Sequence, residues 1–249
     1  MRSDELTALL ESAAGDYSLC VWRDGAQVYG YREHVTRSAA SLVKVPLALA
    51  IVDAGIDLDA VVILREPDRV AGDGTFDRAP AGTSATVREL IGYALTESDN
   101  TASNLLIDRI GMDRVNAWLT QHGLATRLRR RFMDHESLRA GRDNTTTAAD
   151  MCAILELLRE SRYEWFIDLL SHSVADGKLE AGLPPGVRLA HKVGDLPSVE
   201  HDAGIVFAPG SPYVIAALAV DLPDSQSGRR ALAAASRLVW RMMTMDDGR

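Results

Sequence analysis

The chain has 249 residues, enough for one domain or two modest lobes that bury a substantial core. Hydrophobic residues make up 47% of it and charged residues 25%, which is typical of a soluble globular protein. The net charge of −8 disfavours nucleic acid and anionic membrane, because both repel an acidic surface. We expect no nucleic-acid or membrane partner, and a monomer.

Residues 1–11 lack the basic start and the apolar stretch of a signal peptide, and no run approaches the roughly 20 apolar residues of a membrane span. We expect a cytoplasmic protein, with export only if a leader is missing. Cys20 and Cys152 lie in apolar segments, where a free cysteine behaves as a small hydrophobe. The sequence does not decide whether the two form a disulfide. Neither they nor the histidines have metal-ligand spacing, so we expect no metal and no cofactor.

The first predicted elements are a helix and a hairpin. Residues 3–14 have one apolar face and stop at Gly15, which indicates an amphipathic helix. Strands at 17–23 and 27–32 then flank Asp24-Gly25, a strong signal for a tight turn.

The middle of the chain, from Ser41 to about Leu179, is a series of predicted helices. Thr86 and Glu89 form a capping box at the start of one of them. Further helices are expected at 102–110, at 115–123 and after Thr147.

Strands return at 188–193, 203–207 and 213–220, and a final helix is expected at 229–243. The simplest packing is an α+β fold, in which a five-stranded antiparallel sheet is flanked by the N- and C-terminal helices. We expect residues 1–36 and 184–249 to form this α/β lobe and residues 37–183 to form an inserted all-helical lobe.

Ser41-x-x-Lys44 begins an apolar helix, so the two side chains share one face at the end where the helix dipole is positive. Burial of Lys44 would lower its pKa and let its neutral amine take the serine proton. The chain has only three lysines, and every other cationic side chain except histidine is arginine, which cannot act as a base. The alternative is a capping serine beside an exposed lysine.

Two further motifs fit a serine hydrolase. In Ser98-Asp99-Asn100, Ser98 would relay a proton to the leaving nitrogen and Asn100 would donate its amide to a substrate carbonyl. In Lys192-Val193-Gly194, Lys192 would attract a substrate carboxylate and Gly194 would allow close approach to the backbone. Taken alone, the first is also an ordinary turn and the second a surface strand lysine.

Together, in this order, the motifs resemble those of class A β-lactamases and penicillin-binding proteins. The resemblance extends over nearly the whole chain: residues 96–106 are similar to the family's longer central signature, and residues 126–128 and 142–147 to the borders of its Ω-loop. It implies an acyl-enzyme at Ser41, proton transfer by Lys44 and Ser98, and an oxyanion hole made by the N–H groups of Ser41 and Asp195.

Two positions depart from the family's pattern. Val193 stands where the family has Thr or Ser, so one hydroxyl for a substrate carboxylate is missing. Phe132 falls where the family has the glutamate that activates the deacylating water. Glu136 could be a relocated base, although loop acids such as Asp134 and Glu136, next to several arginines, more often form ion pairs.

The sequence therefore predicts a serine hydrolase of small molecules that opens β-lactam rings through an acyl-enzyme, with deacylation in doubt. Alternatives are an esterase or D-alanyl peptidase-like hydrolase acting on an ester or amide, or a sensor that is acylated once without turnover.

Overall fold

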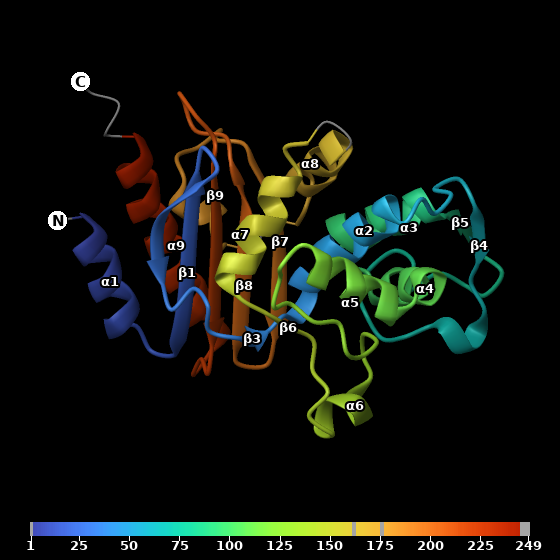
Figure 1. Cartoon of the computed structure of the whole chain (residues 1–249). Helices are drawn as coiled ribbons and strands as arrows, with labels where there is room; N and C mark the ends of the chain where they lie inside the picture. The colour runs from blue at the N-terminus through green and yellow to red at the C-terminus, as the bar shows by residue number, and fades with distance from the viewer. Residues whose placement is uncertain (1, 161–162, 175–176, 245–249) are drawn as a thin grey trace. The chain divides into compact units, whose positions relative to one another are not determined.

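The computed structural model describes residues 2–160, 163–174 and 177–244 (Figure 1). The backbone contacts divide the chain into two compact units. Unit 1 comprises residues 1–42 and 147–249, and unit 2 comprises residues 43–146.

Unit 1 contains the predicted five-stranded antiparallel sheet. Its strands are β1 (Asp16–Arg23), β2 (Ala26–Tyr31), β7 (Leu189–Leu196), β8 (Val199–Val206) and β9 (Tyr213–Val220), in the spatial order β2-β1-β9-β8-β7. Asp24 and Gly25 connect β1 to β2 with φ values of 52° and 76°, the left-handed pair that a two-residue hairpin turn needs. The α+β fold is thereby confirmed.

β7 and β8 are longer than the sequence predicted, because they continue into a hairpin closed at Pro197 and Ser198. The extension contains buried polar side chains, each of which has a partner. His191 Nδ1 lies 2.8 Å from Asp202 Oδ1. His201 Nδ1 accepts from Ala219 N–H at 3.1 Å, so its Nε2, 2.8 Å from the Ser38 carbonyl oxygen, is the donor.

Helices cover both faces of this sheet, as predicted for the terminal helices. α1 (Arg2–Ser12) and α9 (Ser225–Thr244) pack together on one face, where Leu19, Val21 and Ile215 meet Leu6 and Leu232 in the core. Alternate residues of β1 point to the other face, where Cys152 Sγ of α7 (Ala148–Leu157) donates to the Cys20 carbonyl oxygen at 3.3 Å. Both cysteines are buried and free.

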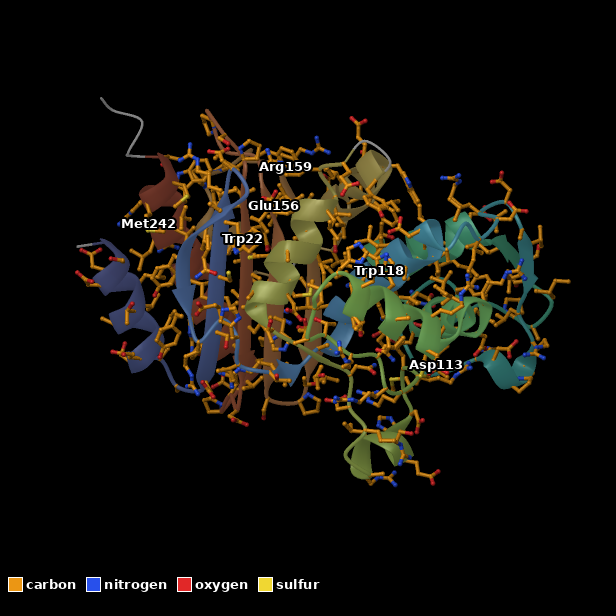
Figure 2. All side chains as sticks on the ribbon, viewed as in Figure 1. Trp22, Asp113, Trp118, Glu156, Arg159 and Met242 are labelled. Atoms are coloured by element: carbon orange, nitrogen blue, oxygen red, sulfur yellow. The ribbon has the colours of Figure 1, made fainter. Side chains whose placement is uncertain are left out.

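Unit 2 is mainly helical, with α2 (Lys44–Asp53), α3 (Val87–Thr96), α4 (Asn100–Ile110), α5 (Met112–Gln121) and α6 (His135–Arg139). The capping box at Thr86 and Glu89 forms as predicted. Trp118 of α5, labelled in Figure 2, donates its indole N–H to Asp53 at the end of α2, at 2.7 Å. Short elements also occur: η2 (Glu66–Asp68) and the strands β4 (Val61–Ile63), β5 (Ser84–Thr86) and β6 (Thr145–Thr146).

Unit 1 also includes α7, α8 (Glu164–Ser171), the strand β3 (Arg37–Ser38) and η4 (Glu180–Gly182). α7 packs on β1 and β9, and α8 on β7. The helical lobe expected from the sequence, 37–183, included α7 and α8, whereas the contacts place both helices in unit 1. A helical pattern does not reveal which partner its apolar face will meet. No helix in the described part of the chain is both long and apolar enough to cross a bilayer.

Candidate active site

Lys44 is the centre of a polar cluster in unit 2. Its amine is fully buried at the start of the apolar helix α2. Nζ donates to the Ser98 carbonyl oxygen, to Ser98 Oγ at 3.2 Å and to Asn100 Oδ1 at 2.9 Å. These bonds hold the buried amine beside the Ser98 hydroxyl.

The loop that presents Ser98 is fixed by two buried carboxylates. Asp99 caps α4 by accepting from Ala102 N–H at 2.7 Å, and it also accepts from Phe76 N–H and Asp77 N–H. Asp77 in turn accepts from Thr101 N–H at 2.8 Å. Burial raises the pKa of Asp99, with the nearby charge of Asp77 contributing in the same direction.

These bonds hold Ser98 in a left-handed conformation with φ of 58°. A residue with a Cβ adopts this conformation at a cost, roughly 1–2 kcal/mol, that the surrounding contacts must offset. The sequence identified Ser98-Asp99-Asn100, but the partner Asp77 was not anticipated, since nothing in its local sequence links it to residue 99.

Phe132 covers the Lys44 amine, with 4.4 Å between Nζ and the ring centroid. Its backbone is clamped by Asn104, which accepts from Phe132 N–H at 2.8 Å and donates to the Phe132 carbonyl oxygen at 3.0 Å. An aromatic face thus contacts the ammonium group at the position where the family's pattern predicted a glutamate.

The loop acids are placed differently from the expected ion pairs. Asp134 caps α6 by accepting from Ser137 N–H at 2.9 Å, and this bond lowers its pKa. Glu136 lies on α6 and is exposed. The arginines of the loop pair elsewhere: Arg130 with Asp143 and Arg131 with Asp108.

Ser41 lies in unit 1, in η1 (Ala40–Val43), which leads directly into α2. Ala40 precedes it with φ of 45°, a second strained residue next to a predicted site residue. Gly194 of β7 packs against this turn: a Cβ added there would lie 3.2 Å from Ser41 N and 3.1 Å from Ala40 Cβ. Glycine therefore lets the strand approach the Ser41 backbone closely.

The other residues of the β7 motif are buried in the same unit. Lys192 is fully buried, and its Nζ donates to the Val193 carbonyl oxygen at 3.1 Å. Val193 is also buried and brings no hydroxyl.

Asp195 joins a cluster that the sequence did not indicate. The fully buried Lys178 donates to the carboxylate of Asp195, lies 2.8 Å from Glu200 Oε2, and donates to the His201 carbonyl oxygen at 3.2 Å. Burial and the neighbouring Glu200 raise the pKa of Asp195 to about 6, against the pull of Lys178. The one sequence signal that could have pointed to this cluster is that Lys178 is one of only three lysines in the chain.

The structure therefore brings the predicted residues together in two groups. Lys44, Ser98 and Asn100 meet in unit 2, and Gly194 packs on the backbone of Ser41 in unit 1. Glu136 belongs to neither of these contact groups as the structure describes them. Among the described residues, no group of three or more His, Cys, Asp or Glu side chains could hold a metal ion.

Comparison with known proteins gives consistent results. A family model described as the β-lactamase enzyme family matches residues 1–243. A β-lactamase of Bacteroides uniformis is 24% identical over 96% of this chain and 90% of its own length. The crystal structure of a β-lactamase from Sphaerobacter thermophilus matches with a TM-score of 0.87 and 26% identity, covering 98% of this chain and 97% of that one. The L158E mutant of PBP-A, in an acyl-enzyme complex with penicillin G, has the same fold, with a TM-score of 0.88, 24% identity and coverage of 98% and 96%.

Proposed function

Because this chain belongs to the β-lactamase enzyme family and is a β-lactamase-like serine hydrolase of cyclic amides, we propose that it opens a β-lactam ring through an acyl-enzyme at Ser41. The observation that supports this most is the bond from the buried Lys44 amine to Ser98 Oγ, at 3.2 Å. A buried amine hydrogen-bonded to the Ser98 hydroxyl is the arrangement that is needed to pass a proton to the leaving nitrogen through Ser98 Oγ.

In the acylation step, the neutral amine form of Lys44 takes the proton of Ser41 as Ser41 Oγ attacks the lactam carbonyl. The new O–C bond forms, the lactam C–N bond breaks, and the leaving nitrogen takes a proton through Ser98 Oγ. The charge that develops on the carbonyl oxygen is stabilised by the N–H groups of Ser41 and Asp195. The close packing of Gly194 against the Ser41 backbone supports this oxyanion hole, since Asp195 follows Gly194 in β7.

Asn100 and Lys192 position the substrate in this proposal. Asn100 Nδ2 donates one bond to the Ala71 carbonyl oxygen at 3.2 Å, and its second N–H is available for a substrate carbonyl. Lys192 contributes positive charge from a fully buried position in β7.

Deacylation is the slow step. Phe132 supplies an aromatic face at the Lys44 amine, and a phenyl ring cannot take a proton from water. Glu136 is the alternative base, but it is exposed on α6. We therefore propose that the acyl-enzyme accumulates and is hydrolysed slowly.

The test is incubation with a chromogenic cephalosporin, followed by colour and by intact mass. We expect an adduct on the wild-type protein with slow colour development, and neither with Ser41→Ala. Ser12→Ala, an exposed serine of α1, is the matched control and should behave as the wild type.

Other outcomes separate the competing functions. Inertness to lactams with cleavage of simple esters would support the esterase or peptidase-like alternative, and an adduct that never turns over would support a sensor. Fast turnover would contradict slow deacylation, and Glu136→Gln would then show whether Glu136 is the base.

A further inference from the structure

Asp77 is a buried carboxylate of unit 2 that binds three backbone N–H groups. Its Oδ1 accepts from Thr101 N–H at 2.8 Å, and its Oδ2 accepts from Gly74 N–H at 3.1 Å and from Asn100 N–H at 3.4 Å. Asn100 and Thr101 are the first two residues of α4, where the N–H groups have no partner within the helix. The carboxylate therefore joins the segment 74–77 to the start of α4.

The loop of residues 71–77 is shaped around this carboxylate. A Cβ added at Gly72 would overlap with Asp77 Oδ2, so glycine is what lets the backbone approach the carboxylate this closely. The neighbouring residue, Ala71, accepts from Asn100 Nδ2 through its carbonyl oxygen at 3.2 Å. Asp77 thus holds Asn100 at two points, directly at its backbone N–H group and through the loop at its side-chain amide.

Asn100 is the residue through which this arrangement reaches the proposed reacting groups. While Nδ2 is bound to the Ala71 carbonyl oxygen, the amide presents Oδ1 to Lys44 Nζ at 2.9 Å. An amide turned the other way would direct an N–H group at the Lys44 amine and lose this bond. The orientation of Asn100 therefore controls both its contact with Lys44 and the N–H group that would bind the substrate carbonyl.

We propose that Asp77 is a positioning residue for acylation, which fixes the orientation of Asn100. This inference rests on the proposed acylation of Ser41. A carboxylate is needed, because an amide in its place would turn its NH2 group towards at least one of the three N–H donors. The bond from Asp77 N–H to Asp99 Oδ2, at 2.9 Å, is made by the backbone, so it does not depend on the Asp77 side chain.

The experiment is a double-mutant cycle on the second-order rate constant of acylation by penicillin G, measured by rapid quenching and intact mass. The variants are Asp77→Asn, Asn100→Ala and the two combined. Asp73→Asn is the matched control, because it removes the same charge from the same loop and its side chain is fully exposed. Far-UV circular dichroism checks folding, and Gly72→Ala, which displaces the Asp77 carboxylate, replaces Asp77→Asn if the latter does not fold.

We expect Asp77→Asn to lower the acylation rate about tenfold or more when Asn100 is present, since a small misplacement of a positioning group costs much of the rate. In the Asn100→Ala background the same change should cost less than about threefold, because the residue through which Asp77 acts is missing. A purely structural role of Asp77 would give equal losses in both backgrounds. Asp73→Asn should react as the wild type does.

Three results would overturn the role of Asp77 while leaving the acyl-enzyme intact. These are a normal rate in Asp77→Asn, equal losses in the two backgrounds of the cycle, and a loss as large in Asp73→Asn. A wild-type protein that is not acylated would overturn the proposed function, and this inference with it.

Discussion

Phe132 stands at the position where the resemblance to the family predicts a glutamate. Its ring lies on the Lys44 amine, and two hydrogen bonds with Asn104, one accepted and one donated by the amide, fix its backbone independently of the side chain. Substitution of the side chain therefore changes what faces Lys44 and leaves the path of the loop in place.

Phe132→Glu should speed deacylation by at least about tenfold, since it places a carboxylate where a water-activating base is needed and pairs it with Lys44. The measurement is the decay of the acyl-enzyme by intact mass after excess substrate is removed. Phe132→Leu is the control, because it removes the ring without adding a base and should leave the decay slow. Equal decay in both variants would show that the position does not determine deacylation.

At this scale the three motifs together, with their resemblance to those of the β-lactamase family, predicted Ser41, Lys44, Ser98 and Lys192 as site residues. It did not reveal Asp77 or Lys178, which reach the site through contacts between segments distant in sequence. Asp134 was expected in an ion pair but caps α6, because the N–H group of Ser137 lies within reach of its carboxylate.

At the scale of elements, β7 and the η1 turn depend on each other at Gly194. A Cβ there would approach Ser41 N and Ala40 Cβ within 3.2 Å, closer than ordinary van der Waals contact, so one of the two elements must move by a few tenths of an ångström. A small displacement of oxyanion-hole donors costs much of their effect, since their geometry must match the transition state.

Gly194→Ala should therefore lower the acylation rate about tenfold or more while reducing the free energy of unfolding by only about 1 kcal/mol. Acylation is followed by intact mass and stability by urea unfolding. The control is Gly92→Ala, because nothing lies within 4 Å of a Cβ added at Gly92. Gly25→Ala is unsuitable as a control, because Gly25 has a positive φ that an alanine adopts only with strain. A normal acylation rate in Gly194→Ala would mean that the close packing is not needed for reaction.

Elements with strong local signals were predicted well. The Asp24-Gly25 turn and the Thr86 capping box form as their sequences indicated, because their stability depends on nearby residues. The ends of β7 and β8 were missed, since Glu200, His201 and Asp202 are polar residues that enter a strand only when distant partners satisfy them.

At the scale of the whole molecule, the stability should depend on the protonation of His201. Burial lowers its pKa to about 4, and both ring nitrogens have partners suited to the neutral form. An unfolded histidine has a pKa near 6.5, so protons bind the unfolded state first as the pH falls. The contribution of His201 to the free energy of unfolding is therefore full above about pH 6.5 and is lost progressively as the pH falls towards 4.

Between pH 7 and pH 5 this loss is about 2 kcal/mol of unfolding free energy, measured by urea unfolding. His201→Gln should be less stable at pH 7 but should lose less stability over this interval. His34→Gln, at an exposed histidine, should keep the wild-type dependence. Asp195, whose pKa is raised to about 6, changes the free energy of unfolding in the opposite direction over this interval. It is present in both the wild type and His201→Gln, so the difference between the two profiles isolates His201. Parallel profiles for His201→Gln and wild type would rule out this role.

The burial of all three lysines, Lys44, Lys178 and Lys192, has a practical result for chemical labelling. Reagents that acylate primary amines should therefore leave the three lysine side chains of the folded protein unmodified. Lysine labels would appear only as the chain unfolds, which makes the number of labelled lysines a measure of intact structure.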